Sequence, residues 1–298
     1  MQIIERNIQQ IGHSFLITLP KDWATMLKLK KGASLKMIIS DQGSLSIAPE
    51  FTKNTEEKHA TFPYDANFER SFIREYFNGT TKITITYPEK TNTKPIHTLL
   101  KHFLNTQIIE ETDTRIIIKC FRIEDLTIQE CFKRMFYLTL NLIEHMNTLH
   151  PNEQTEIHDT ITRFYYMMIM QIRVYLNEGR FITDQHISLL RAMDYRMAGE
   201  RLQRIAQLTT TFTREKNQSE LDKFISSLRN NLTKAGHLFL ANDYEKARTL
   251  WKQFHTERDT ITAMKTRTYK NKEIILYQNL HTLESIFTSI KDITMFIR

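Results

Sequence analysis

Apolar and polar positions alternate near the start of the chain in the manner of β-strands. The alternation runs over residues 15–19 and returns over residues 33–40 and 44–48, with the period of two that half-buried strands show. Between these segments, Pro20 opens a short amphipathic stretch that closes at Gly32. Proline suits the first helical position because its missing N–H would be unpaired there. These residues therefore predict a β-β-short helix-β-β arrangement.

Residues 1–50, which we call the head, are too few to fold alone with so many strand edges. A domain of this size hides little surface from water, and open strand edges invite pairing with another chain. We therefore expect a second copy of the chain to complete the head, which gives a homodimer through residues 1–50.

The next part of the chain mixes two periods. Residues 51–66 are polar and show no period, which is typical of a linker. Residues 67–125 combine the helical period with strand alternation. The predicted elements are a helix that ends at Asn78-Gly79, a strand over residues 82–87, a helix over residues 95–104, and a hairpin of residues 107–111 with 115–120. We expect these elements to form a small α/β domain in which helices cover a sheet.

From residue 127 onward, apolar residues recur every three or four positions, which is the period of amphipathic helices. Thr127 and Glu130 are spaced as a capping box before the first run. In the third run, the positions expected to face the core include Leu190, Met193 and Met197. The runs repeat as two sets of three, so we predict two tandem three-helix bundles, residues 126–215 and 216–298.

Composition narrows the possible functions only slightly. The 298 residues carry a formal net charge of +7, which fits a nucleic acid or another anionic partner. Basic residues along helices are more often a solvated face, however, so the charge alone decides little. The start of the chain lacks a signal-peptide pattern, and no apolar run reaches the roughly 18 to 20 residues that span a bilayer. We expect a soluble, cytoplasmic protein with no membrane insertion.

The sequence offers little that indicates catalysis. Cys120 and Cys131 are the only cysteines, and they lack the spacing of a zinc site or a disulfide framework. A glycine-rich phosphate loop, a Gly-x-Ser-x-Gly elbow and a His-Glu-x-x-His motif are all missing from the sequence. We therefore expect a protein that is not an enzyme and that uses no cofactor.

Four short motifs in the head occur together and in order. They are Gly-His-Ser at residues 12–14, Leu-Pro-Lys-Asp-Trp at 19–23, Leu-Lys-Lys-Gly at 29–32 and Gly-Ser-Leu-Ser-Ile-Ala-Pro at 43–49. This set resembles the swapped-hairpin DNA-binding domains of the SpoVT/AbrB/MazE type. The resemblance implies an intertwined homodimer that lays its paired strands on duplex DNA.

The residues near the first glycine and the short helix are the candidates for DNA contact. They are Arg6, Gln9, Gln10, His13, Ser14 and Lys21. Many domains of this type carry basic side chains just before the glycine, where this chain has Gln9 and Gln10. Glutamine reads adenine in the major groove but releases no counterion, so we expect weaker DNA affinity than lysine or arginine would give. The alternative is a head that only dimerises.

The body of the chain resembles the archaeal PhoU-type phosphate-uptake regulators. The resemblance is carried by residues 72–80, 108–113, 134–136, 163–166 and 202–207. In that group a swapped-hairpin head precedes a PhoU body, so the two resemblances agree in order. They imply a multidomain α+β fold: a small swapped-hairpin β domain, a small α/β domain and two tandem, mainly α, three-helix bundles.

The same resemblance implies a function and leaves an alternative. The implied protein is a DNA-binding transcriptional regulator of phosphate uptake, whose helical body acts as a sensor or docking module. The alternative is an adaptor that does not bind DNA, dimerises through its head and binds a phosphate-transporter ATPase or a signalling kinase. An antitoxin is disfavoured because antitoxin tails are generally short and disordered, whereas this body is long and periodic.

The PhoU family carries a Glu-x-x-x-Asp motif late in each repeat, which supplies the oxygen ligands that hard metal ions need. The matching positions in this chain are Gln203, Gln207, Glu284 and Thr288. Three of these four side chains are neutral, so we expect no tight metal cluster. Glu284 and Asp292 are the remaining carboxylates near the second motif.

Overall fold

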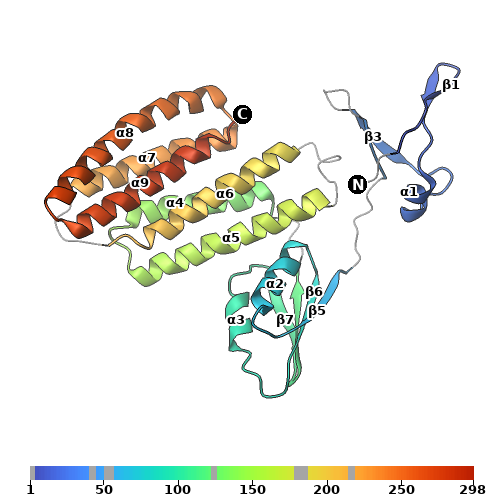
Figure 1. Cartoon of the computed structure of the whole chain (residues 1–298), viewed down its shortest axis with the longest axis horizontal. Helices are drawn as coiled ribbons and strands as arrows, with labels where there is room; N and C mark the ends of the chain where they lie inside the picture. The colour runs from blue at the N-terminus through green and yellow to red at the C-terminus, as the bar shows by residue number, and fades with distance from the viewer. Residues whose placement is uncertain (1–3, 40–44, 50–56, 122–125, 178–186, 214–218) are drawn as a thin grey trace. The chain divides into compact units, whose positions relative to one another are not determined.

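The structure is a computed structural model that describes residues 4–39, 45–49, 57–121, 126–177, 187–213 and 219–298 (Figure 1). The fold is mixed α+β, with a small β-rich N-terminal part and a mainly helical C-terminal part. The chain divides into two compact units, residues 1–56 and 57–298, and each is described by itself. Residues 40–44, which join two predicted strands, and residues 51–56 of the predicted linker lie outside the described residues.

Two separate strand pairs and one short helix make up the head. β1 (Gln9–Ile11) pairs with β2 (Ser14–Leu16), and β3 (Leu35–Ile39) pairs with β4 (Leu45–Pro49), both antiparallel. Between them in the sequence lies α1 (Lys21–Met26). The element order is the one that the alternation predicts, although the first strand pair begins earlier than residue 15.

A two-residue turn joins β1 to β2. Ile11 and Ser14 are directly paired, so Gly12 and His13 form the loop between them. Gly12 has φ +61°, a conformation that costs little only without a Cβ atom. Gln10 Nε2 donates to the carbonyl oxygen of Gly12 at 3.0 Å. Glycine at the first loop position is what a type II′ hairpin turn requires, and the twist of this turn matches that of the strands.

Four strands and two helices form the α/β domain. In chain order they are β5 (His59–Pro63), α2 (Phe68–Phe77), β6 (Lys82–Thr86), α3 (Lys94–Leu100), β7 (Thr106–Glu111) and β8 (Arg115–Cys120). The sheet order is β5-β6-β8-β7, with β5 parallel to β6 and the other neighbours antiparallel. Ile83 and Ile85 on β6 and Ile116 and Ile118 on β8 are fully buried. They point to one face because alternate residues of a strand share a side.

Strand β5 corrects the predicted linker over residues 51–66. Residues His59–Pro63 pair in register with Lys82–Thr86 and add a fourth, parallel strand at the edge of the sheet. The strand is short and its residues are exposed or half-buried in alternation. A mixed five-residue segment between polar neighbours gives too few apolar positions for a period to stand out. The pairing partner supplies the order that the local sequence does not encode.

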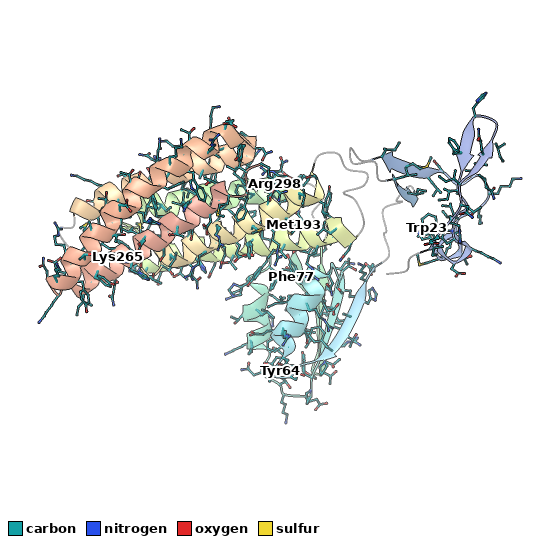
Figure 2. The ribbon with its side chains drawn as sticks, turned by 45° about the horizontal axis from the view of Figure 1, so that its top comes forward. Trp23, Tyr64, Phe77, Met193, Lys265 and Arg298 are labelled. Carbon is teal, nitrogen blue, oxygen red and sulfur yellow. The ribbon has the colours of Figure 1, made fainter. Side chains whose placement is uncertain are left out.

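Aromatic side chains fix the α/β domain to helix α5 (Pro151–Asn177). The ring of Phe77 meets the ring of Tyr166 edge-on at 5.7 Å, and Phe103 stacks on Tyr166 at 5.4 Å between centroids. Tyr76 donates from its hydroxyl to Asn105 Oδ1 at 2.7 Å, within the same buried cluster. Burial raises the pKa of Tyr76, so the hydroxyl keeps its proton and remains a donor. Figure 2 labels Phe77 at this contact.

Six long helices form the C-terminal body. They are α4 (Ile128–His145), α5, α6 (Leu189–Thr209), α7 (Ser219–Ala241), α8 (Tyr244–Lys270) and α9 (Ile274–Thr294). The predicted capping box is present, since Thr127 Oγ1 accepts from Glu130 N and the Glu130 carboxylate accepts from Thr127 N. Buried apolar residues from all six helices belong to one continuous core. None of the described helices has both the length and the apolar character that crossing a lipid bilayer requires.

Helix α6 corrects part of the predicted core face of the third helical run. Leu190, Met193 and Met197 are 52%, 50% and 43% exposed, and Figure 2 labels Met193. The buried face combines large residues, Tyr195, Leu202 and Ile205, with small ones such as Ala192, Ala198 and Gly199. Small residues allow neighbouring helices to approach closely: a Cβ atom on Gly199 would lie 2.2 Å from Met168 Cε. The prediction overlooked these small residues, because a hydrophobic period is read mainly from large apolar side chains.

The ends of α6, α7 and α9 meet around two arginines. Arg191, on the first turn of α6, donates to the carbonyl oxygens of Phe239 at the end of α7 and of Phe296 after α9. Arg298 Nη2 donates to Asp194 Oδ1 at 3.2 Å, and Asp194 is only 2% exposed. Cations are favourable beside the last carbonyls of a helix, where the helix dipole is negative.

Candidate nucleic-acid interface

The β1–β2 hairpin divides the predicted DNA-contacting residues between its two faces. Gln9 is paired with Leu16, and Ser14 lies two residues before Leu16 on the same strand. Paired residues and alternate residues share a face, so Gln9 and Ser14 point to one side. Gln10 is paired with Phe15, and both point to the other side. The hairpin therefore offers one glutamine to a ligand on either face.

The other three candidates lie outside the paired strands. Arg6 precedes β1 and donates from Nη1 to the carbonyl oxygen of its neighbour Glu5 at 3.1 Å. His13 is in the turn, and Lys21 is the first residue of α1. All three are exposed. The structure thus brings Gln9 and Ser14 together and spreads the remaining candidates over the turn, the opposite face and the flanking segments.

The sequence analysis missed a second group of cations in the head. Lys28, Lys30 and Lys31 follow α1 directly and are exposed, and Lys36 is exposed on β3. The described part of the head holds six basic side chains against the two acidic ones, Glu5 and Asp22. A local excess of positive charge supplies the sequence-independent share of DNA affinity. The run Lys-Leu-Lys-Lys over residues 28–31 was the visible signal for this group.

None of the head residues whose side chains the structure describes is buried. Large apolar side chains are exposed on both strand pairs, on the hairpin flanks and on α1. The most exposed are Ile8 at 69%, Ile11 at 65%, Phe15 at 73%, Met26 at 70%, Met37 at 67% and Ile39 at 78%. Trp23, which Figure 2 labels, is half-buried. So many exposed apolar side chains in one small unit are typical of an interaction surface.

The carboxylate left at a motif position, Glu284, and the nearby carboxylate of Asp292 both have cationic partners. Glu284 Oε2 accepts from Lys265 Nζ, and Lys265 is labelled in Figure 2. Asp292 Oδ2 lies 3.1 Å from Arg201 Nε, an ion pair without hydrogen-bond geometry at that nitrogen. A neighbouring cation neutralises the charge that would attract a metal ion.

The other motif positions use their polar groups locally. Gln203 is half-buried, and Gln207 Oε1 accepts from Arg204 Nη1 at 3.1 Å. Thr288 Oγ1 donates to the carbonyl oxygen of Glu284 one helical turn earlier, at 2.9 Å. Across the described ranges, no group of three or more His, Cys, Asp and Glu side chains is placed to hold a metal ion.

The two cysteines are protonated at neutral pH. Burial raises the pKa of the Cys120 thiol and of the Cys131 thiol to about 12. The thiolate is the form that attacks electrophiles and binds metals. Burial therefore disfavours the thiolate form of both side chains near pH 7.

Comparison with known proteins adds no relative. No family model matches this chain, and no curated protein or solved structure matches it.

Proposed function

We propose that this protein is a DNA-binding transcriptional regulator of phosphate uptake, in which the head binds DNA as a homodimer and the helical body senses or docks a partner. The observation that carries the proposal is the head, which combines a glycine-dependent hairpin turn, an excess of basic side chains and apolar side chains that the described residues of the head leave exposed. Each of these properties fits a small β unit that is completed by a second copy and used on an anionic ligand.

Dimerisation follows from the exposed apolar side chains. Fully burying one Ile, Phe or Met side chain stabilises a protein by about 1.5–3 kcal/mol, and the head exposes several such residues, including Ile11, Phe15 and Ile39. A swapped arrangement of hairpins from two chains would bury them and pair the open strand edges. It would also bring together two copies of the basic segment over residues 28–31.

The phosphate part of the proposal rests on the resemblance of the body to PhoU-type regulators. We take α4–α6 and α7–α9 as the two tandem three-helix bundles of that family. Because Glu284 and Asp292 already pair with Lys265 and Arg201, we propose that the body works through protein contacts rather than through a metal cluster. A change in how two bodies pack would alter the spacing of the two heads and so the DNA affinity, with a coupling of about 1–3 kcal/mol.

The second candidate is an adaptor that uses the head only to dimerise. Its support comes from the two glutamines before the turn. Gln10 Nε2 donates to the carbonyl oxygen of Gly12, so this side chain already serves its own hairpin. Neither Gln9 nor Gln10 adds charge at the position where related domains carry basic residues. In this alternative, the cations of the head are a solvated face.

Fluorescence anisotropy with the full-length protein separates the two candidates. Promoter fragments from phosphate-transport genes and scrambled duplexes of equal length are titrated at several salt concentrations. A DNA-binding regulator prefers the promoter, and Arg6→Ala with Lys21→Ala lowers its affinity and reduces the salt slope by about one per lost phosphate contact. Lys234→Ala, at an exposed lysine of α7, is the matched control and leaves both quantities unchanged.

Weak binding that ignores the DNA sequence and disappears near physiological salt would overturn DNA regulation in favour of the adaptor. The coupling has its own test, in which the same titration is repeated with purified phosphate-transporter subunits present. A DNA affinity that is equal with and without those subunits would refute communication between body and head, whatever the result of the first titration.

A further inference from the structure

The turn between α8 and α9 exposes apolar side chains at one end of the helical body. Helix α8 ends at Lys270 and α9 begins at Ile274, so three residues make the connection. Figure 1 shows this turn at one end of the helical body. Tyr269 is 75% exposed and Ile274 is 68% exposed, and Ile275 beside it is 38% exposed. These exposed fractions are high, because isoleucine is usually buried and tyrosine is usually at least half-buried.

Basic side chains surround the apolar ones. Arg267, Lys270 and Lys272 are exposed within the same turn and the end of α8. Glu273 is the acidic residue of the segment, and its Oε1 accepts from Asn271 Nδ2 at 3.2 Å. Lys265, which precedes these residues on α8, forms an ion pair with Glu284. The segment over residues 266–278, which we call the tip, therefore carries three basic side chains and one acidic one.

Lys272 takes a conformation that favours glycine. Its φ is +60°, and its N–H donates to the carbonyl oxygen of Tyr269, while Glu273 N donates to that of Thr268. This is the bonding pattern of a helix that ends in the left-handed region, where glycine is the usual residue. A lysine there costs the fold free energy. It also places an ammonium group, on the four-carbon stem of the lysine, in the exposed connection between the two helices.

We propose that the tip binds the surface of a membrane that contains anionic lipids, with Tyr269 and Ile274 entering the headgroup region and Lys270 and Lys272 contacting lipid phosphates. The connection is three residues long and presents few exposed apolar side chains, whereas a stable protein interface buries roughly 1,000 Å². The mixture of exposed basic and apolar side chains instead matches an anionic lipid surface. Tyrosine prefers the boundary between water and hydrocarbon, and basic side chains near it are attracted to anionic headgroups.

This proposal does not rest on the regulatory function. It requires no membrane-spanning helix, because the contact is peripheral and reversible, like that of other shallow amphipathic anchors. It would bring the helical body to the membrane.

Vesicle co-sedimentation with the full-length protein tests the tip. The vesicles contain either phosphatidylcholine alone or equal parts of phosphatidylcholine and phosphatidylglycerol. Each basic residue near an anionic surface contributes about 1 kcal/mol, or roughly fivefold in partitioning, so Lys270→Ala combined with Lys272→Gly should lower binding to the anionic vesicles roughly 25-fold. The glycine also relieves the positive φ, so the variant remains folded. Ile274→Ser should lower binding without any change in charge.

The control for charge is the pair Lys234→Ala and Lys252→Ala, which removes two exposed cations from α7 and α8 away from the tip. The control for the apolar change is Ile109→Ser, at a 54% exposed residue of β7. Because the basic head also attracts anionic vesicles, the decisive quantity is the difference between tip variants and controls. Equal loss in both sets, or no binding of the unaltered protein to anionic vesicles, overturns the proposal.

A local reporter makes the test independent of total binding. Cys120 and Cys131 are buried, so a thiol-reactive, polarity-sensitive dye labels an introduced cysteine selectively. The dye on Asn271→Cys should shift to the blue when anionic vesicles are added, and the same dye on Lys234→Cys should not shift. A dye at position 271 that stays in water while the protein sediments with the vesicles would refute the proposal, because another surface would then hold the membrane. If a protein partner causes the blue shift at position 271 and the vesicles do not, the membrane proposal is likewise refuted and the tip is assigned to protein binding.

Discussion

The ion pair between Arg298 and Asp194 should contribute measurably to the stability of the helical body. Asp194 is 2% exposed, and its Oδ1 accepts from Arg298 Nη2 at 3.2 Å. Among the described residues, Asp194 Oδ2 has no hydrogen-bond partner. Removing one partner of a buried pair costs about 3–5 kcal/mol, because the other charge stays unpaired in the interior. The Arg298 side chain is 54% exposed, so solvent screens the pair and we expect Arg298→Ala to cost about 1–2 kcal/mol.

Urea unfolding followed by circular dichroism measures this loss as a lower transition midpoint at constant slope. Asp194→Asn removes the buried charge, so Arg298→Ala should cost less in that background, with a coupling of about 1 kcal/mol in the double-mutant cycle. Met295→Ala, at a 58% exposed residue next to the end of α9, is the control and should change stability by less than about 0.5 kcal/mol. If Arg298→Ala behaves like this control, or if the cycle shows no coupling, the pair does not stabilise the junction of α6 with α9.

Three further predictions concern the core and a helix start. Gly236→Ala should destabilise the body by about 1–3 kcal/mol in the same urea assay, although alanine is the better helix former, because its Cβ atom would lie 2.1 Å from Phe136 Cε2. Thr127→Ala should cost about 0.5–2 kcal/mol through loss of the capping bond to the start of α4, whereas Thr127→Ser should retain most of it. Since burial raises the pKa of Cys120 and Cys131 from 9.0 to about 12, the unfolded chain ionises first, so the free energy of unfolding should fall as pH rises from about 9 to about 12. Thiol titration with and without urea checks the same point, and fast labelling of the native protein near pH 7 would contradict it.

Long periodic segments were predictable because many residues repeat the same signal. The helices that became α4, α5 and α7 to α9, and the hairpin of β7 with β8, all lie where the periods place them. Short elements were less well defined: α3 ends at Leu100 rather than at residue 104, and β5 was assigned to a linker. Such segments owe their order to a partner that is distant in sequence, and no local pattern contains that information.

Burial on α6 was mispredicted for a different reason. Hydrophobicity ranks Leu190, Met193 and Met197 above Ala192 and Ala198, yet the alanines are buried. Close helix packing selects for small side chains, and a hydrophobic period cannot distinguish a packed alanine from a solvated one. In the same way, Asp194 was invisible as a core residue, because nothing near it in the sequence announces a partner more than a hundred residues away.

The candidate DNA-contacting residues were chosen without a strand register. Once Gln9 and Gln10 are placed on β1, alternation alone puts them on opposite faces. The alternation in the sequence indicates a strand over residues 15–19 and not over residues 9–11, so it does not predict that the two glutamines face opposite sides. The lysines over residues 28–31 follow the predicted short helix and were not among the candidates. Which face meets a ligand depends on the second chain, and one chain's sequence does not specify how two hairpins interlock.

Helix α6 also limits how the protein can be divided for experiment. It packs against α4 and α5, which precede it in the sequence, and against α9, which follows it, so a cut at residue 215, the boundary that the repeat predicts, would separate α6 from α9. A fragment that ends there would leave the α9-facing surface of α6 in water. A fragment that begins at residue 216 would lack α6, the helix that packs against α9. Each half should therefore express poorly alone, and the two should recover native secondary structure only when mixed.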